Sequence, residues 1–122
     1  MSTKVLVTGS RDFKDYQVVY DALDEIYADG MPMIVIHGAA RGADNFADTW
    51  AVHRKNVTVV RVPADWDNDG WGAGPKRNEA MLELGPKIVL AFFQEGAANK
   101  GTTHMSTAAR KAGLDVRVYR GA

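Results

Sequence analysis

The sequence predicts an α/β domain built on a five-stranded parallel sheet, and three observations support this fold class. Five short apolar runs of strand length alternate with segments in which apolar residues recur at helical spacing. Glycine stands at many of the junctions between the two kinds of segment, as tight turns require. The chain has 122 residues and contains no internal repeat or low-complexity stretch. We therefore expect a single domain over residues 1–122 with a sizeable core.

The order of the strands follows from their composition. The predicted strands are the runs 4–8, 33–37, 57–62, 88–93 and 115–119. The first, second and fourth are apolar throughout, as central strands of a parallel sheet are. The third contains Thr58 and Arg61 and the fifth contains Arg117, so both are expected at edges. The order 3-2-1-4-5 satisfies this expectation, whereas 2-1-3-4-5 would put the apolar second strand at an edge. The prediction is a Rossmann-like three-layer sandwich with the order 3-2-1-4-5.

Four helices are predicted between these strands. The first begins near Phe13 and ends at Gly30, the second spans the apolar positions 43–51, and the third runs over 75–84. The fourth has the apolar face Met105, Ala108, Ala109 and Ala112 and ends at Gly113. The segment 63–74 has no such spacing and is interpreted as a flexible acidic lid. Its two tryptophans either stack on a base or close the segment onto the core.

Composition excludes several classes of function. Acidic and basic residues number 15 each, which argues against a generally basic nucleic-acid coat. There is no cysteine, so disulfides and thiolate metal sites are excluded, and the histidines have no metal-binding spacing. Neither G-x-G-x-x-G nor G-x-x-x-x-G-K-[ST] occurs. We expect a cytoplasmic protein without a signal peptide, membrane span, metal or cofactor.

Two loops with phosphate-binding character are expected to face each other. The predicted order sets the first strand beside the fourth, at the switch point where open sheets bind ligands. Gly9, Ser10 and Arg11 follow the first strand, offering N–H groups, a hydroxyl and a guanidinium. The residues Lys100, Gly101, Thr102 and Thr103 follow the fourth, where a threonine is expected to cap the next helix. Neither loop alone excludes an ordinary turn, but together with the loop after the second strand they indicate a ligand site.

Two further segments extend this predicted site. The loop after the second strand contributes Gly38, Arg41, Gly42 and Asp44. Asp44 either favours the start of the helix or accepts hydrogen bonds from ribose hydroxyls. The start of the third helix contributes Gly74, Arg77, Asn78 and Glu79. Arg77 suits an anion, Asn78 a base or ribose, and Glu79 either acid–base chemistry or the helix dipole.

These segments resemble a known family. The runs VTGSR, HGAARGAD, AGPKRNEAM and KGTT are similar to those of the YspA-like branch of the SLOG superfamily, whose members occur in bacteria and phages. The superfamily includes the Lonely Guy phosphoribohydrolases and the Smf/DprA proteins. The resemblance spans nearly the whole chain and implies a Rossmann-like fold, a nucleotide-derived ligand and a homodimer.

The resemblance also bears on catalysis. Lonely Guy enzymes carry the motifs R-K-x-x-M and G-G-x-G-T-x-x-E. Arg77 and Met81 match the first motif with Asn78 for its lysine, and Met105 stands where the second has its catalytic glutamate. The leading prediction is therefore a sensor or sequestering module for a nucleoside monophosphate or an ADP-ribose-like ligand. The alternatives are an N-glycosidase or phosphoribohydrolase that uses Arg77 with Glu79 or Asp44, and single-stranded nucleic-acid binding of the DprA type, against which the neutral charge argues.

Overall fold

The computed structural model describes residues 2–27 and 31–122 and has one five-stranded parallel sheet. The strands are β1 (Thr3–Gly9), β2 (Met33–His37), β3 (Val57–Arg61), β4 (Ile88–Gln94) and β5 (Asp115–Gly121). The helices are α1 (Tyr16–Ile26), α2 (Ala43–Val52), α3 (Trp66–Asp69), η1 (Gly70–Gly72), α4 (Ala73–Glu83) and α5 (Lys100–Lys111). The strand order is β3-β2-β1-β4-β5, so the predicted fold class and order are confirmed.

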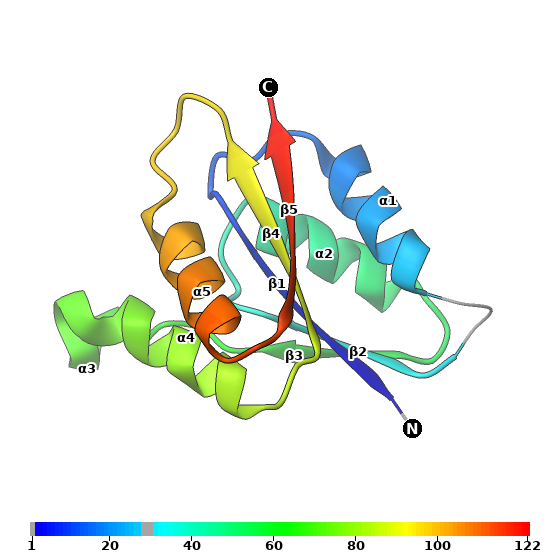
Figure 1. The fold of residues 1–122 in the computed structure, drawn as a ribbon, viewed down its shortest axis with the longest axis horizontal. Helices are drawn as coiled ribbons and strands as arrows, with labels where there is room; N and C mark the ends of the chain where they lie inside the picture. The colour runs from blue at the N-terminus through cyan, green and yellow to red at the C-terminus, as the bar shows by residue number, and fades with distance from the viewer. Residues whose placement is uncertain (1, 28–30) are drawn as a thin grey trace.

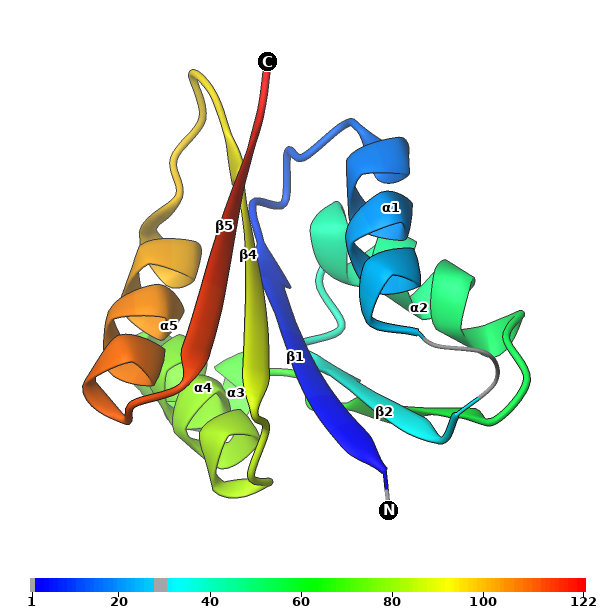
Figure 2. The same cartoon turned by 45° about the vertical axis from the view of Figure 1, so that its right-hand side comes forward.

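The helices cover both faces of the sheet, which makes three layers. Figures 1 and 2 show α1 and α2 on one face and α4 and α5 on the other. Each face of the sheet has its own hydrophobic core. Alternate residues of β1 pack into one core or the other, because successive side chains of a strand point to opposite faces. Val5 and Val7 pack with Leu23 and Trp50 of the first pair of helices. Leu6 packs with Met105 and other residues of the second pair.

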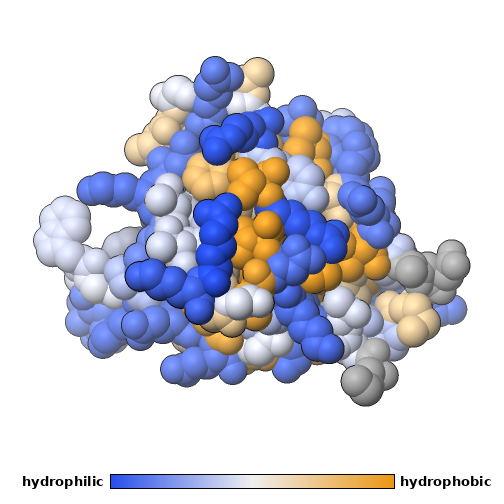
Figure 3. Space-filling model, in the orientation of Figure 1, coloured by the Kyte–Doolittle hydropathy of each residue, from blue (hydrophilic) through white to orange (hydrophobic). Residues whose placement is uncertain are grey.

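The two strands with mixed composition lie at the edges, as predicted. β3 pairs with β2 on one side, and β5 pairs with β4 on the other. In Figure 3 apolar residues gather over the middle of the face that β5 crosses, with hydrophilic side chains around them. Val118 of β5 is partly exposed, and Asp115 and Arg117 of the same strand pair with each other. Charged side chains of this kind discourage the edge from pairing with another chain.

The expectation that the segment 63–74 contains no helix is wrong, because most of the segment is helical. Asp65 caps α3 by accepting a hydrogen bond from the backbone of Asn68, and η1 leads directly into α4. α4 therefore begins two residues before the expected Pro75. A proline is tolerated there because the N–H groups of a first helical turn need no partner within the helix.

Helix ends agree with the prediction at some positions and differ at others. Gly85 and Gly113 have φ of +78° just after α4 and α5, the left-handed conformation that glycine favours at helix ends. The expected stop of the first helix at Gly30 lies outside the described residues. The predicted threonine cap of α5 is wrong, because Asn99 is the N-cap and the threonines lie inside the first turn.

Candidate functional site

A cleft of about 720 Å³ opens where the loops after β1 and β4 meet the starts of α4 and α5. β1 and β4 are neighbours, so the two loops that the sequence assigned to phosphate face the same space. Most of the predicted site residues line this cleft: Gly9, Ser10, Arg11, Arg41, Asp44, Gly74, Arg77, Asn78, Lys100, Gly101 and Thr102.

Four predicted residues lie outside the cleft lining. Gly38 lines an adjoining hollow of about 420 Å³ that shares Arg77 with the cleft. Gly42 has a φ of +79°, and a Cβ there would lie 2.4 Å from the carbonyl oxygen of Ser10, so its role is to let two loops pack. Glu79 and Thr103 are exposed and are not among the residues that line the cleft.

The turn after β1 is held rigidly against the neighbouring elements. The backbone N–H of Ser10 donates to the carbonyl of Phe92 at 2.9 Å, and the Ser10 hydroxyl accepts from the backbone N–H of Asp12 at 3.1 Å. A Cβ at Gly9 would lie 2.3 Å from the Cβ of Ala43, so only glycine lets β1 end this close to α2. The turn is thus preformed, with the Arg11 side chain left exposed at the rim.

The start of α5 presents unpaired backbone donors to the cleft. Among the described residues, none accepts a hydrogen bond from the N–H groups of Lys100, Gly101 or Thr102. The N-cap residue Asn99 does not help, because its side chain bonds the backbone N–H and C=O of Gln94 instead. Free N–H groups and the helix dipole together attract an anion to this point.

Asp44 is a buried carboxylate with one unsatisfied oxygen. Asp44 is only 5% exposed. Its Oδ2 accepts hydrogen bonds from the backbone N–H groups of Gly38 at 3.1 Å and Ala40 at 3.3 Å. Its Oδ1 is buried and has no hydrogen-bond partner among the described residues. Burial raises the pKa of Asp44 from 3.8 to about 6, although His37, Ala40, Arg77 and Gly38 act in the opposite direction. A buried acceptor left without a donor is a feature that a ligand hydroxyl or amine would satisfy.

Arg77 begins a chain of hydrogen bonds across the floor of the cleft. Its Nη1 donates to the carbonyl of Gly38 at 2.7 Å and its Nε to the Oδ1 of Asn78 at 3.1 Å. The Nδ2 of Asn78 then donates to the Nδ1 of His104 at 3.0 Å. Burial lowers the pKa of Arg77, and Arg11 lowers it further, while Asp44 opposes them. His104 lines the cleft and was not predicted, although its position one turn after Lys100 places it on the same side of α5.

A second hydrogen-bond network holds the loop after β2 in place. The Nδ1 of His37 accepts from the backbone N–H of Ala39 at 2.9 Å, so its Nε2 carries the proton and donates to Asp48 at 2.7 Å. Asp48 also accepts from Arg61 at 2.7 Å, and this bond is the main reason that the pKa of Asp48 is lowered. Ala39 has a φ of +58°, a conformation that a non-glycine residue holds only when its surroundings impose it.

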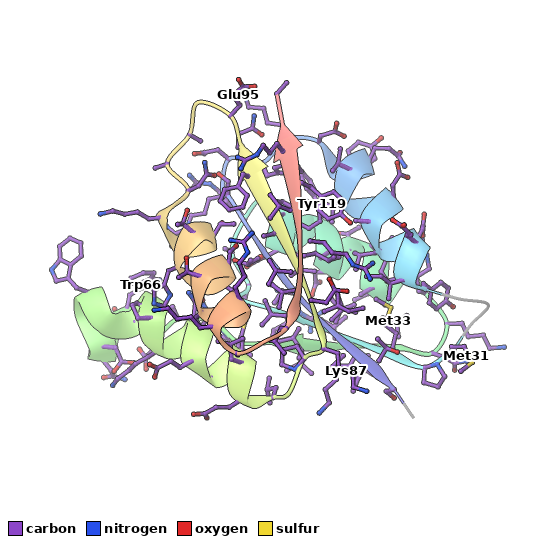
Figure 4. The ribbon with its side chains drawn as sticks, viewed as in Figure 1. Met31, Met33, Trp66, Lys87, Glu95 and Tyr119 are labelled. Atoms are coloured by element: carbon purple, nitrogen blue, oxygen red, sulfur yellow. The ribbon has the colours of Figure 1, made fainter. Side chains whose placement is uncertain are left out.

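Two tryptophans stand at the rim of the cleft, and neither is part of the core. Trp66 is 49% exposed and Trp71 is 97% exposed. Trp66 lies against the start of α4 on the side toward α5 (Figure 4), with its ring edge 3.6 Å from where a Cβ of Gly74 would be. The guanidinium of Arg11 lies over the Trp66 ring, 5.7 Å from its centre. Of the two roles left open for these residues, closure onto the core is therefore wrong.

Met105 does not face the cleft. It is 0% exposed and packs with Leu6, Ile36, Met81, Val89 and Ala109 between the sheet and α5. The residues of α5 that line the cleft are Lys100, Gly101, Thr102 and His104. The position that motif comparison assigned to a catalytic glutamate is thus a core position in this protein.

Residues 2–27 and 31–122 contain neither a cluster of metal ligands nor a helix that could span a membrane. Within these ranges no three histidine, cysteine, aspartate or glutamate side chains gather as metal ligands would. None of the helices in these ranges has the length and apolar character needed to cross a membrane.

Comparison with known proteins identifies the family. A family model described as "YspA, cpYpsA-related SLOG family" matches residues 3–68, which include the loops after β1 and β2. The chain is 42% identical over 118 residues to the "Gene 61 protein" of Mycobacterium phage D29, with 93% of each chain covered. No solved structure matches the chain. The chain therefore belongs to the YspA, cpYpsA-related SLOG family, as the resemblance of its loops predicted.

Proposed function

We propose that this protein binds a nucleotide or a nucleotide-derived ligand in the cleft, as a sensor or sequestering module. Membership of the SLOG family suggests a nucleotide-related function. The main support is that one cleft contains both unpaired hydrogen-bond donors and an unpaired acceptor. The start of α5 offers three unpaired N–H groups for an anion, and Asp44 offers an unpaired acceptor for a neutral donor. A phosphate joined to a sugar with free hydroxyls satisfies both.

The ligand is held in the following way under this proposal. Its phosphate accepts hydrogen bonds from the backbone at Lys100 and Gly101, with Arg11 supplying charge from the opposite loop. A ribose hydroxyl donates to Asp44. The cleft volume of about 720 Å³ lies within the range of small-molecule sites. Nη1 and Nε of Arg77 bond to Gly38 and Asn78, which position the guanidinium, and its Nη2 donates a hydrogen bond to the ligand.

Arg77→Ala is expected to weaken nucleotide binding by about tenfold to a hundredfold, because a hydrogen bond to a charged group contributes about 1.5–3 kcal/mol. Calorimetric titration with the four nucleoside monophosphates and ADP-ribose checks this. Arg110→Ala is the matched control, since it removes the same charge from the far end of α5, outside the cleft. If the wild-type protein binds none of these compounds at millimolar concentration, the proposal is wrong.

Gly101→Val is expected to abolish phosphate binding and leave the fold intact. Gly101 is exposed in the first turn of α5, and a Cβ there would meet no atom within 4 Å. The isopropyl group would instead fill the space that the phosphate needs. Titration of the variant checks binding, and a urea midpoint close to the wild-type value checks folding. Wild-type affinity in the folded variant would move the phosphate to another part of the cleft.

A second candidate function is hydrolysis of an N-glycosidic bond, which one observation favours. A carboxyl group with a pKa of about 6 in a cleft suits general-base chemistry near neutral pH, and Asp44 is such a group. The oxygen of water would bond to the anomeric carbon while Asp44 takes its proton. The C–N bond would break with its electron pair going to the base, which takes up a proton. Release of free base from nucleoside monophosphates, lost in Asp44→Asn, would support this candidate, and absence of product from the wild-type protein would refute it.

A further inference from the structure

Trp71 is exposed to a degree that the fold itself does not require. Its side chain is 97% exposed, although tryptophan is among the largest apolar residues and gains stability when it is buried. It nevertheless lines the cleft. By contrast, Trp50, from α2, is fully buried in the core. A large apolar side chain at the mouth of a binding cleft, without contacts in the free protein, points to a contact that forms with the ligand.

The backbone around Trp71 is suited to movement. Trp71 is flanked by Gly70 and Gly72, and a Cβ at either position would meet no atom within 4 Å. Gly70 has a φ of +56°, which accounts for glycine there. Gly72 has ordinary helical angles, φ −82° and ψ −6°, so neither space nor conformation requires glycine at this position. Two glycines around one tryptophan lower the barrier to changing its direction.

The neighbouring wall is also suited to an aromatic base. Trp66 stands at the same rim, half exposed, and Arg11 covers part of its ring. Both residues line the cleft together with Trp71. Aromatic rings and guanidinium planes are the groups on which proteins stack bases. The phosphate is drawn to the start of α5, and the charge of Arg11 acts on it from the Trp66 side of the cleft.

We propose that Trp71 is the base-stacking residue of this site. It turns about Gly70 and Gly72 and covers the base of a bound nucleotide, with Trp66 and Arg11 as the adjoining wall. The inference rests on the proposed function and deepens it, because it requires a ligand with an aromatic base and not a sugar phosphate alone. Stacking involves only the face of the base, so all four nucleoside monophosphates are bound with similar affinity.

The test compares ligands that differ only by the base. AMP, GMP, CMP, UMP and ribose 5-phosphate are titrated into the wild-type protein, Trp71→Ala and Trp71→Phe. The wild-type protein binds each nucleotide at least about tenfold more tightly than ribose 5-phosphate, as stacking on an aromatic residue predicts. Trp71→Ala removes that difference and leaves ribose 5-phosphate unchanged, and Trp71→Phe keeps most of it. Tyr16→Ala is the control, because Tyr16 is an exposed aromatic residue of α1, outside the cleft.

Tryptophan fluorescence gives a second readout of the same event. Adding AMP quenches the emission of the wild-type protein, and most of this change is absent in Trp71→Phe, while ribose 5-phosphate causes none. If nucleotides and ribose 5-phosphate bind equally and Trp71→Ala changes neither, the stacking role is overturned and the proposed function stands. If Trp71→Ala weakens ribose 5-phosphate as much as AMP, the residue only supports the turn and the inference is again overturned. If none of the five compounds binds the wild-type protein, the stacking role is overturned, and the proposed function falls with it unless ADP-ribose still binds.

Discussion

Met105→Glu is expected to destabilise the folded domain by at least about 3 kcal/mol at pH 7 and to create no hydrolase. Met105 is 0% exposed, and its core neighbours are the apolar residues Leu6, Ile36, Met81, Val89 and Ala109. A glutamate there must either lose its charge or keep it without a partner. Holding it neutral at pH 7, against an ordinary pKa near 4.3, accounts for about 3–4 kcal/mol. That is a large part of the stability of a small domain.

Urea unfolding measures this effect, with Met105→Leu as the control. Leucine keeps the volume and the apolar character, so the control is expected to lose less than about 1.5 kcal/mol. The loss in Met105→Glu is expected to shrink as the pH falls toward 4, because the glutamate is then neutral in the unfolded chain as well. A folded variant of wild-type stability that releases free base from a nucleotide would contradict the assignment of Met105 to the core.

Met105 illustrates why a motif match can mislead about a single residue. The match placed Met105 at the position of a catalytic glutamate. The helical spacing of the same segment placed it on an apolar face with Ala108, Ala109 and Ala112, and the core contains Met105 and Ala109. Spacing determines where a side chain points from a helix, whereas a motif records only its place in the chain.

The strand order could be predicted because it depends on a property of each strand by itself. A central parallel strand is covered on both faces and must be apolar throughout, whereas Arg61 and Arg117 fit only at edges. The position of the candidate site followed from the order, since parallel strands put their carboxyl ends at one edge of the sheet. Most of the predicted residues accordingly line one cleft.

The supporting contacts could not be predicted, because they join residues that are distant in sequence. His37 and Arg61 become neighbours only through the register of β2 with β3, and Asp48 reaches both from α2. His104 reaches Asn78 only after α4 and α5 have packed on the same face of the sheet. The unpaired oxygen of Asp44 depends on burial, which the composition of the HGAARGAD segment does not reveal.

Asp44 is expected to make the stability of the fold depend on pH between about 4 and 6. Its pKa is about 6 in the folded protein against an ordinary 3.8, so in this interval the folded state binds more protons than the unfolded chain. The free energy of unfolding therefore falls as the pH rises, by up to about 3 kcal/mol at about 1.4 kcal/mol per pH unit. The loss is complete above pH 6, where the buried carboxylate is charged in both states.

Asp44→Asn is expected to remove this pH dependence and to weaken nucleotide binding at pH 8 by about tenfold or more. The amide oxygen of asparagine can still accept from Gly38 and Ala40, but its NH₂ group replaces the free acceptor that the ligand hydroxyl needs. Urea unfolding from pH 4.5 to 8 gives the difference in stability between variant and wild type, which should move in favour of the variant as the pH rises. Asp67→Asn is the control, since Asp67 is exposed and outside the cleft lining.

Parallel stability curves for Asp44→Asn and the wild type would show that Asp44 titrates at its ordinary pKa, and unchanged affinity would remove Asp44 from the ligand contacts. A variant that is more stable at pH 8 and binds less tightly is the expected result, because Asp44 is a buried carboxylate whose Oδ1 has no partner among the described residues, at the place where the ligand is expected to bind.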